Sequence, residues 1–375
     1  MKKISLYIHI PFCEHKCIYC DFYSITITDN LSRFLSALKK EISEFSNYFK
    51  NTEIQSVFLG GGTPSLLSAK QIDEILSTIC HYSNLGEGVE ITLETNPGTV
   101  DLQKLKEFKK LGINRLSIGV QSFNDMELKF LTRIHDGKSA IKTIEDANRV
   151  GFDNINLDLI FNLPKQTQSI WEKNLQTALA LPVKHISTYS LILERGTILN
   201  KLVSEKKILI NNDDFDASLY EFTMEYLSAK GFNQYEVSNF CKTGYECIHN
   251  LTYWHHKNYI GFGPSAHSFY KNKRWWNCSG VKQYINKITQ TGNAVCGSEK
   301  LSDDKLLDEY VMLALRSNGL NLKKLENIYG NGWFMQNREY LNHLKRNNFV
   351  IEKDNFIKFT PKGYLLCDEI LQKLK

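Results

Sequence analysis

The sequence predicts an α/β protein, a partial (β/α)6 TIM-like barrel followed by a smaller C-terminal α+β domain. Two observations carry this prediction. Short β-rich runs alternate with amphipathic segments six times before residue 205, and the alternation then stops. Repeated strand–helix alternation requires a parallel sheet with right-handed crossovers. The loops that follow the strands then meet at one rim, which is where we expect a ligand site.

Each predicted strand is a run of four to eight residues rich in β-branched and apolar side chains. The helices between them have apolar residues at helical spacing, as in the segment 31–45. The strands are expected over Leu6–Ile10, Ile54–Leu59, Val89–Glu94, Arg115–Val120, Asn154–Ile160 and His185–Leu191. We therefore assign residues 1–205 to the barrel.

Residues 206–300 form a predicted connecting region. It holds a helix over Asp213–Lys230, which Gly231 ends, and an aromatic, Gly-rich stretch over Tyr245–Trp276 that we expect to be irregular loops. Residues 301–375 hold two helices, Asp303–Ser317 and Phe334–Lys345, then a hairpin about residues 354–355 and a final helix. This order predicts a winged-helix-like domain, which does not by itself reveal a function.

The composition is that of an ordinary globular chain. Hydrophobic residues make up 42% and charged residues 23% of the 375 residues, and no apolar run reaches the eighteen needed to span a bilayer. The formal charge is +5, with lysines scattered over helix faces, so no nucleic-acid partner is expected. The count of nine cysteines is odd and no signal peptide precedes the first strand, so we expect reduced thiols and a cytoplasmic protein.

The most informative motif is Cys13-x3-Cys17-x2-Cys20, directly after the first strand. Three thiolates can hold three irons of a [4Fe-4S] cube and leave the fourth open to a small molecule. A zinc site is an alternative, with His9 or His15 as the fourth ligand, but no second ligand pair follows at the usual spacing. The sequence thus favours an iron-sulfur site on the rim.

Polar residues also follow the other strands. Gly60-Gly-Gly-Thr-Pro-Ser65 offers close backbone approach to a ligand, although strand-to-Gly turns are common and the ending of a P-loop is missing. The next strands end in Glu94-Thr-Asn-Pro97, Gln121-Ser-Phe123 and Asp158. Any one of these suits a capping or turn role, but together they predict one pocket.

With these motifs, the chain resembles radical S-adenosylmethionine (SAM) proteins of the oxygen-independent coproporphyrinogen III oxidase group. The resemblance extends over nearly the whole length and includes Gly119–Phe123, Asp158–Pro164 and Gly261–Ser268. It implies that Cys13, Cys17 and Cys20 ligate a [4Fe-4S] cluster. It also implies a SAM site lined by Tyr7, Tyr19, Gly61, Gly62, Thr63, Glu94, Gln121, Arg133 and Asp158.

Two features separate the oxidases of this group from its haem chaperone branch. The similar oxidases carry a fourth cysteine where this chain has Phe22, and they have a longer N-terminal segment. Conversely, residues 249–254 match the HNxxYW motif of the haem chaperone branch. The resemblance therefore implies a protein that binds haem and delivers it to haem proteins such as respiratory enzymes. Coproporphyrinogen oxidation is the alternative, so the sequence leaves open whether the protein is an enzyme.

The implied haem contacts are His249 as axial ligand, with Asn250, Tyr253 and Trp254 beside the porphyrin. A histidine hydrogen-bonded among packed aromatic rings is the alternative. Cys247, His255, His256 and His267 compete as ligands, and the role of His267 is open. The sequence also leaves open a homodimer and peripheral membrane contact. A third functional class, a nucleic-acid-binding radical SAM protein, is supported only by modest basic pairs such as Lys323-Lys324.

Overall fold

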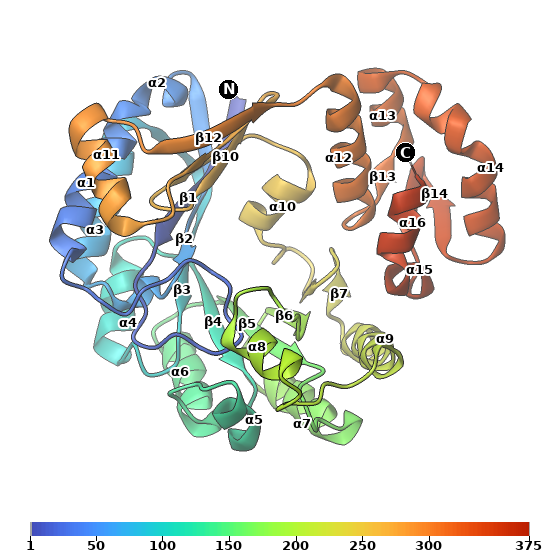
Figure 1. Ribbon diagram of the computed structural model, residues 1–375, viewed down its shortest axis with the longest axis horizontal. Helices are drawn as coiled ribbons and strands as arrows, with labels where there is room; N and C mark the ends of the chain where they lie inside the picture. The colour runs from blue at the N-terminus through green and yellow to red at the C-terminus, as the bar shows by residue number, and fades with distance from the viewer. Residues whose placement is uncertain (1, 375) are drawn as a thin grey trace.

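A computed structural model describes residues 2–374 and confirms the predicted α/β class. Within these residues, twelve strands form one curved sheet in the order β12-β11-β10-β9-β1-β2-β3-β4-β5-β6-β8-β7. The pairs from β1 to β6 are all parallel, and β9 is also parallel to β1. Antiparallel strands extend the sheet at both edges. The result is the partial (β/α)6 barrel that the sequence predicts (Figure 1).

The six parallel strands end within two residues of the predicted positions, but β1 and β3 begin four and five residues earlier than predicted. They are β1 Lys2–Ile10, β2 Thr52–Gly61, β3 Asn84–Thr95, β4 Arg115–Gln121, β5 Asn154–Phe161 and β6 His185–Ser190. The edge strands are β7 Asn233–Gln234, β8 Asn239–Cys241, β9 Tyr259–Phe262, β10 His267–Tyr270, β11 Lys273–Asn277 and β12 Val295–Lys300. Strands buried on both faces read as nearly continuous apolar runs, which is why the sequence located the central six so well.

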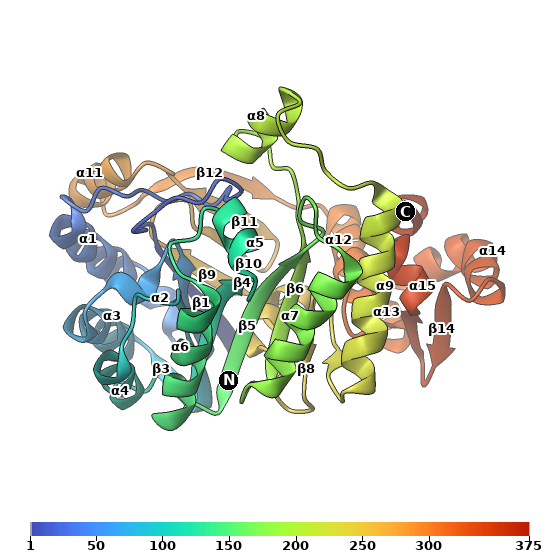
Figure 2. The ribbon, with the colours of Figure 1, turned by 90° about the horizontal axis from the view of Figure 1, so that it is seen from below.

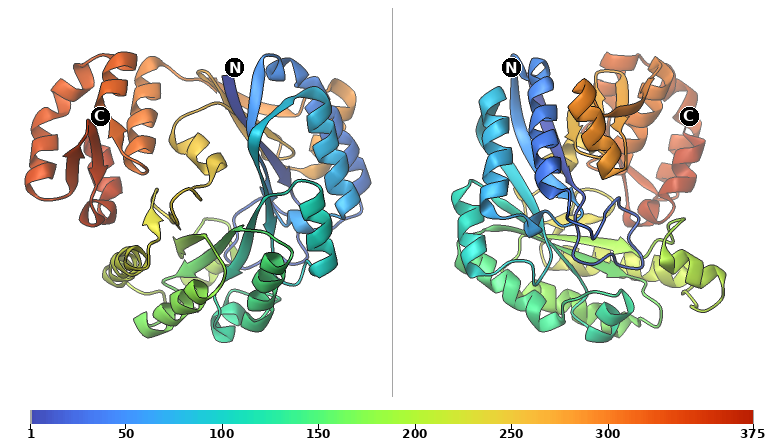
Figure 3. Two further views of the ribbon diagram at one scale, coloured as in Figure 1. Left: turned by 180° about the vertical axis from the view of Figure 1, so that it is seen from behind. Right: turned by 60° about the vertical axis from the view of Figure 1, so that its left-hand side comes forward.

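Helices cover the outer face of the curved sheet and bury its apolar side chains (Figures 1 and 3). The barrel helices are α1 Leu31–Glu44, α2 Ser46–Phe49, the 3-10 turn η1 Pro64–Leu66, α3 Ala69–Tyr82, α4 Leu102–Lys110, α5 Asp125–Phe130, α6 Gly137–Arg149, α7 Gln168–Ala180, α8 Ile198–Ser204, α9 Asp213–Ala229 and α11 Val281–Thr291. Polar side chains cap many of them, as Asp101 does by accepting from the backbone N–H of Lys104.

Two short helices depart from this outer layer. Helix α8 stands out from the body beside the carboxyl ends of the strands (Figure 2). Helix α10, Ile248–Trp254, lies on the inner face of the sheet and packs on β2 (Figure 1). Helix α10 therefore covers part of the inner face of the sheet.

The C-terminal residues form a separate small sheet with its own apolar core. Its elements are α12 Asp303–Leu315, β13 Leu320–Asn321, α13 Leu322–Tyr329, α14 Gly332–Arg346, β14 Val350–Lys353, β15 Phe356–Phe359, α15 Pro361–Leu365 and α16 Cys367–Lys373. The predicted hairpin is present, because Asp354 and Asn355 adopt the positive φ that a tight turn requires. The domain packs on the barrel through α9 and α10.

Two expectations are wrong. The stretch 245–276 contains α10 and three strands in place of irregular loops, because short four- to seven-residue elements rich in aromatic side chains have too little periodicity to show in the sequence. Cys278 and Cys296 form a disulfide in place of two free thiols, since the antiparallel pairing of β11 with β12 brings their Cα atoms within 5.1 Å.

Candidate functional site at the strand carboxyl ends

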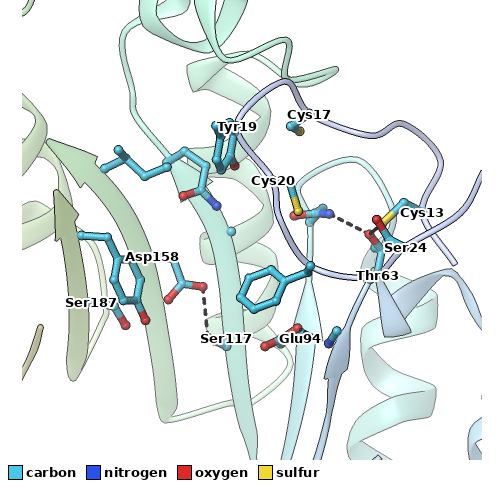
Figure 4. Close-up of a pocket in the computed structure, with 18 of the residues that line it drawn as sticks. Cys13, Cys17, Tyr19, Cys20, Ser24, Thr63, Glu94, Ser117, Asp158 and Ser187 are labelled. Atoms are coloured by element: carbon cyan, nitrogen blue, oxygen red, sulfur yellow. Dashed lines mark hydrogen bonds between the residues drawn. The ribbon is translucent and has the colours of Figure 1, made fainter. Parts of the chain in front are cut away.

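A cavity of about 440 Å³ opens at the carboxyl ends of the barrel strands. It brings together residues that lie on or directly after the five strands β2 to β6 and the loop that carries the three cysteines (Figure 4). Of the predicted site residues, the cavity is lined by Cys13, Cys17, Tyr19, Cys20, Gly61, Gly62, Thr63, Glu94, Gln121, Arg133, Asp158 and Asn250. The predicted meeting of strand ends at one rim is therefore what the structure shows.

The cysteine loop is fixed at its base by backbone hydrogen bonds. The N–H of Cys13 donates to the carbonyl of Ile25 at 2.9 Å, and the N–H of Ile25 donates to Pro11 at 2.7 Å. On the other side, the N–H groups of Gly62 and Thr63 donate to the chain that enters the loop. A Cβ at Gly62 would stand 2.7 Å from a backbone oxygen, so only glycine permits this close approach.

The middle of the cysteine loop is held by the segment after α5. Thr132, which has a φ of 57°, accepts a hydrogen bond from the N–H of Ile18 at 3.2 Å and lies 3.3 Å from the His15 ring. The N–H of Leu199 on α8 donates to the carbonyl of Ile18 at 2.9 Å. The three cysteines are thus carried by a long loop that several elements position.

Two of the cysteine sulfurs already have polar neighbours. The Thr63 hydroxyl lies 3.5 Å from Cys13 Sγ, and Arg133 Nη1 lies 3.6 Å from Cys17 Sγ. Donors of this kind stabilise thiolates. Burial raises the pKa of Cys20 to about 11, and the positive charge of a bound metal would lower it.

The geometry bears on the zinc alternative. No three His, Cys, Asp or Glu side chains in residues 2–374 converge on one point as ligands of a single ion. A cube spreads its thiolates over different irons, so a cluster does not require that convergence. His9 lies buried between the Tyr7 hydroxyl and the Tyr23 carbonyl, and exposed His15 faces Thr132. Neither histidine serves as a fourth ligand in this arrangement.

Two carboxylates face the same cavity. Glu94 at the end of β3 accepts from the N–H of Gly61 at 3.0 Å, and Asp158 on β5 accepts from Asn156 at 2.8 Å and Ser117 at 3.2 Å. Burial, followed by the nearby charge of Asp158, raises the pKa of Glu94 to about 8. Burial also raises the pKa of Asp158. A cationic ligand would lower both pKa values, because its charge favours the ionised carboxylates. The two buried acids are therefore suited to face a sulfonium or ammonium group.

Arg133 holds the opposite charge at the rim. Its Nη2 donates to Asn96 at 2.6 Å and to the carbonyl of Gly119 at 2.8 Å, while its buried Nε has no hydrogen-bond partner. The guanidinium is therefore fixed in place with donor capacity to spare, as a carboxylate site needs. With the thiols and the two acids, this donor set fits a [4Fe-4S] cluster with SAM beside it.

The remaining predicted SAM residues differ in position. Tyr19 lines the cavity, and burial raises its pKa above the usual range. Gln121 ends β4 with a φ of 67°, which directs the chain around the rim. Tyr7 does not line the cavity; it packs against Phe58 and His249, with ring centroids 6.2 and 6.3 Å away.

The HNxxYW motif lies on α10, next to this pocket and mostly outside it. His249 is only 1% exposed, and both of its ring nitrogens have partners, Ser56 Oγ at 3.0 Å and the Tyr253 hydroxyl at 2.8 Å. Burial, followed by the charge of Arg115, lowers the pKa of His249 to about 3. Glu90 accepts from the N–H groups of Ile248 and His249 and so fixes the start of the helix.

The other motif residues point to different surroundings. Asn250 reaches the cavity, the Tyr253 ring meets Tyr259 edge to face at 4.6 Å, and Trp254 is partly exposed. Among the competing ligands, Cys247 is buried against Glu90, and His256 faces Glu309 at 3.2 Å. His255 is partly buried, while His267 is exposed and stacks on Trp276. The motif is thus a packed helix with one side chain in the pocket.

The sequence interpretation missed the inner walls of the pocket. Arg115, Ser117, Asn156 and Ser187 line the cavity below the rim, together with Phe58 and Ile160. Their signal was period-two alternation within strands that read as continuous apolar runs. Polar residues at every second position of β4 and β5 mark the inward face.

Comparisons with known proteins agree with this geometry. The radical SAM superfamily model matches residues 7–178. The chain is 35% identical over 369 residues to the "Heme chaperone HemW" of Bacillus subtilis (strain 168), covering 98% of this chain and 97% of that protein. The HemW of Lactococcus lactis subsp. lactis (strain IL1403) is 33% identical, with 99% and 97% covered.

Among solved structures, the coproporphyrinogen III oxidase HemN from Escherichia coli, a radical SAM enzyme, superposes with a TM-score of 0.85. It covers 100% of this chain and 90% of that one at 24% identity, which shows that the fold is shared. Radical SAM membership implies a [4Fe-4S] cluster and SAM as cofactors. The chain belongs to the radical SAM superfamily and, within it, to the heme chaperone HemW family.

Proposed function

We propose that this protein is a cytoplasmic haem chaperone that binds haem and delivers it to haem proteins such as respiratory enzymes. The observation that carries the proposal is similarity of 33–35% identity to curated heme chaperones over nearly the whole of both chains. The similarity to the oxidase supports only a common fold. Phe22, which is 63% exposed beside the cysteines, stands where the similar oxidases have a fourth cysteine.

The cofactor assignment is part of the proposal. Cys13, Cys17 and Cys20 would ligate the cluster, which would supply one electron to bound SAM for radical chemistry. Arg133 is suited to hold the methionyl carboxylate, because its guanidinium is already fixed by Asn96 and Gly119. Glu94 and Asp158 are suited to accept from the ammonium group and the ribose hydroxyls. Gly61, Gly62 and Thr63 present the backbone and hydroxyl that close the site.

The haem assignment requires movement of α10. With His249 as axial ligand, one ring nitrogen must leave Ser56 or Tyr253 before it can bind iron. Tyr253 and Trp254 would then provide ring surface for the porphyrin and Asn250 would link the haem site to the SAM pocket. We therefore expect haem loading to be slow and accompanied by loosening of α10.

The decisive experiment uses cluster-reconstituted protein under anaerobic conditions, titrated with haem and separately given coproporphyrinogen III with SAM. A shifted Soret band without turnover supports the chaperone. His249→Ala should weaken haem binding and leave the cluster and SAM affinity intact, with His81→Ala, at an exposed position of α3, as the matched control and His267→Ala as the test of a competing ligand. Equal haem affinity of His249→Ala and the parent protein would remove His249 from the proposal.

The oxidase alternative makes the opposite prediction in the same experiment. Catalytic formation of protoporphyrinogen, with SAM consumed, would establish an enzyme despite Phe22. A third outcome, haem binding retained by His249→Ala and lost by His267→Ala, would keep the chaperone function and move the haem to the exposed His267–Trp276 pair. Contact with a haem acceptor, a homodimer and peripheral membrane contact are further proposals, to be tested once haem loading is defined. None of the helices described between residues 2 and 374 is long and apolar enough to cross a bilayer.

A further inference from the structure

We infer that Arg115 forms a second, deep carboxylate-binding site at the inner end of the cofactor pocket, separate from Arg133 at the rim. This inference deepens the proposed function and rests on it for the identity of one of the two candidate ligands. The carboxylate that we assign to Arg115 is a propionate of the tetrapyrrole cargo; the methionyl carboxylate of SAM, assigned above to Arg133, is the alternative that the test must exclude.

Arg115 is a buried cation without a direct partner. The residue is 1% exposed, its Nε has no hydrogen-bond partner, and no ion pair within 4.0 Å joins it to any carboxylate in the described part of the chain. A buried guanidinium is normally paired and hydrogen-bonded, because removing it from water costs several kcal/mol. The guanidinium therefore keeps N–H donors that no protein group satisfies.

The cavity reaches this guanidinium along the inner face of β4. Arg115, Ser117, Gly119 and Gln121 all line the cavity, at every second position of the strand. Side chains on one face of a strand recur at this period, and six residues of strand span roughly 20 Å. The Cα of Arg115 therefore lies at the opposite end of β4 from the rim residue Gln121, and the cavity reaches both residues.

The groups around Arg115 favour its charged form but do not hydrogen-bond to its guanidinium. Burial lowers the pKa of Arg115, but Cys247, Glu90, Tyr235 and Asp158 outweigh it and raise that pKa. The two carboxylates among them are each hydrogen-bonded elsewhere. Glu90 accepts from the N–H groups that begin α10, and Asp158 accepts from Ser117 and Asn156. The carboxylates thus favour the charged form from a distance, and the fork of the guanidinium stays open toward the cavity.

A carboxylate is the ligand group that fits this arrangement. The planar guanidinium donates two parallel hydrogen bonds to a planar carboxylate, and a charge-assisted pair of this kind is strong in a buried site. Ser117 and Asn156 add polar groups on the same wall. Both molecules that the proposed function brings to this pocket carry carboxylates, so the experiment must separate them.

The test compares Arg115→Gln with the parent protein after cluster reconstitution, using three probes: haem, haem dimethyl ester and SAM. The parent should bind haem about tenfold more tightly than the ester, which lacks carboxylates. In Arg115→Gln this ratio should fall to about one, with ester affinity unchanged. Arg149→Gln, an exposed residue paired with Asp146, is the matched control. Arg115→Lys keeps the charge and should show an intermediate ratio if Arg115→Gln fails to fold.

The outcomes separate the ligands and the proposals. A collapsed haem-to-ester ratio supports the propionate site. A weakened SAM affinity with an unchanged ratio would overturn it and move the methionyl carboxylate from Arg133 to Arg115. Unchanged haem ratio and unchanged SAM affinity in a folded Arg115 variant would overturn the inference and leave Arg115 a counter-charge for Glu90 and Asp158. A parent protein that binds no haem would refute the chaperone function, while the SAM probe would still report on Arg115.

Discussion

The rim pocket and helix α10 lie side by side on the inner face of the sheet and differ in how completely their buried polar groups are hydrogen-bonded. In the pocket, the buried Nε atoms of Arg115 and Arg133 have no partners, and Glu94 and Asp158 face a cavity. Under α10, both nitrogens of His249 and both oxygens of Glu90 are hydrogen-bonded. Buried polar groups left open indicate a ligand site, whereas a completed network indicates a packed scaffold.

This difference changes how the two motifs are interpreted. The cysteine and glycine loops are positioned by backbone hydrogen bonds, with their functional atoms directed at a cavity. The HNxxYW motif instead places its histidine at the centre of packing with Ser56, Phe58 and Tyr253. Ligand binding by the first region needs little rearrangement, while haem binding by the second needs bonds to break. The predictions below test this contrast.

Loss of one cluster thiolate should have the largest effect. Cys13→Ala leaves two protein ligands for a cube that requires three, so we expect reconstituted protein to lose its iron and its iron-sulfur absorbance nearly completely. Iron and sulfide analysis after anaerobic gel filtration measures this. Cys80→Ser is the control, because Cys80 is an exposed thiol on α3. Full iron content in Cys13→Ala would exclude the proposed ligand set.

Loss of the rim guanidinium should weaken SAM binding by a smaller factor. Arg133→Met removes a charge-assisted contact worth about 1.5–3 kcal/mol, which corresponds to a Kd roughly 10- to 100-fold higher. Equilibrium titration of cluster-loaded protein with SAM gives this number. Arg149→Met should bind as the parent does. A change below twofold in Arg133→Met would show that the open donor of Arg133 serves the fold and not the ligand.

Removal of the Tyr253 hydroxyl tests the packed region. Tyr253→Phe leaves the ring of His249 with one hydrogen bond fewer, so the free energy of unfolding should fall by about 1–3 kcal/mol. Urea unfolding monitored by circular dichroism measures this loss. If His249 is the haem ligand, the freed Nε2 should also speed haem loading. Faster loading would support a moving α10, and unchanged loading at lower stability would make the hydrogen bond purely structural.

The two regions should also show opposite, smaller effects of pH on stability. His249 has its pKa lowered to about 3 by burial, so the unfolded chain binds the extra proton and stability falls as the pH drops below about 6.5. Glu94 has its pKa raised to about 8 by burial, so the folded chain binds the extra proton between about pH 4.5 and 8 and stability falls as the pH rises. Each slope is at most about 1.4 kcal/mol per pH unit.

Variants can assign these two slopes. Glu94→Gln should flatten the decline toward pH 8, and His249→Gln should flatten the decline toward pH 4, in unfolding curves measured across this range. Glu87→Gln, at an exposed position, should leave the profile unchanged. If Glu94→Gln left the alkaline decline intact, another buried acid such as Glu41, whose pKa burial raises to about 7, would be responsible.

The sequence by itself determined the six central strands, the rim of the pocket and the family. Local patterns suffice for these features, since Cys13-x3-Cys17-x2-Cys20, the glycine loop and the polar residues that follow each strand are contiguous in the chain. The parallel topology then fixes that all strand ends meet at one edge. Their roles in binding the cluster and SAM stay predictions.

Only the tertiary structure decided what lies behind the rim. Arg115 and Asp158 are 43 positions apart and read as members of separate strands, yet the pairing of β4 with β5 places both on one wall. Cys278 and Cys296 meet only through the β11–β12 pairing. The burial of His249 likewise depends on Ser56, nearly two hundred residues away. Side-chain partners are set by long-range packing, and it is those partners that decide whether a polar group stays open to a ligand.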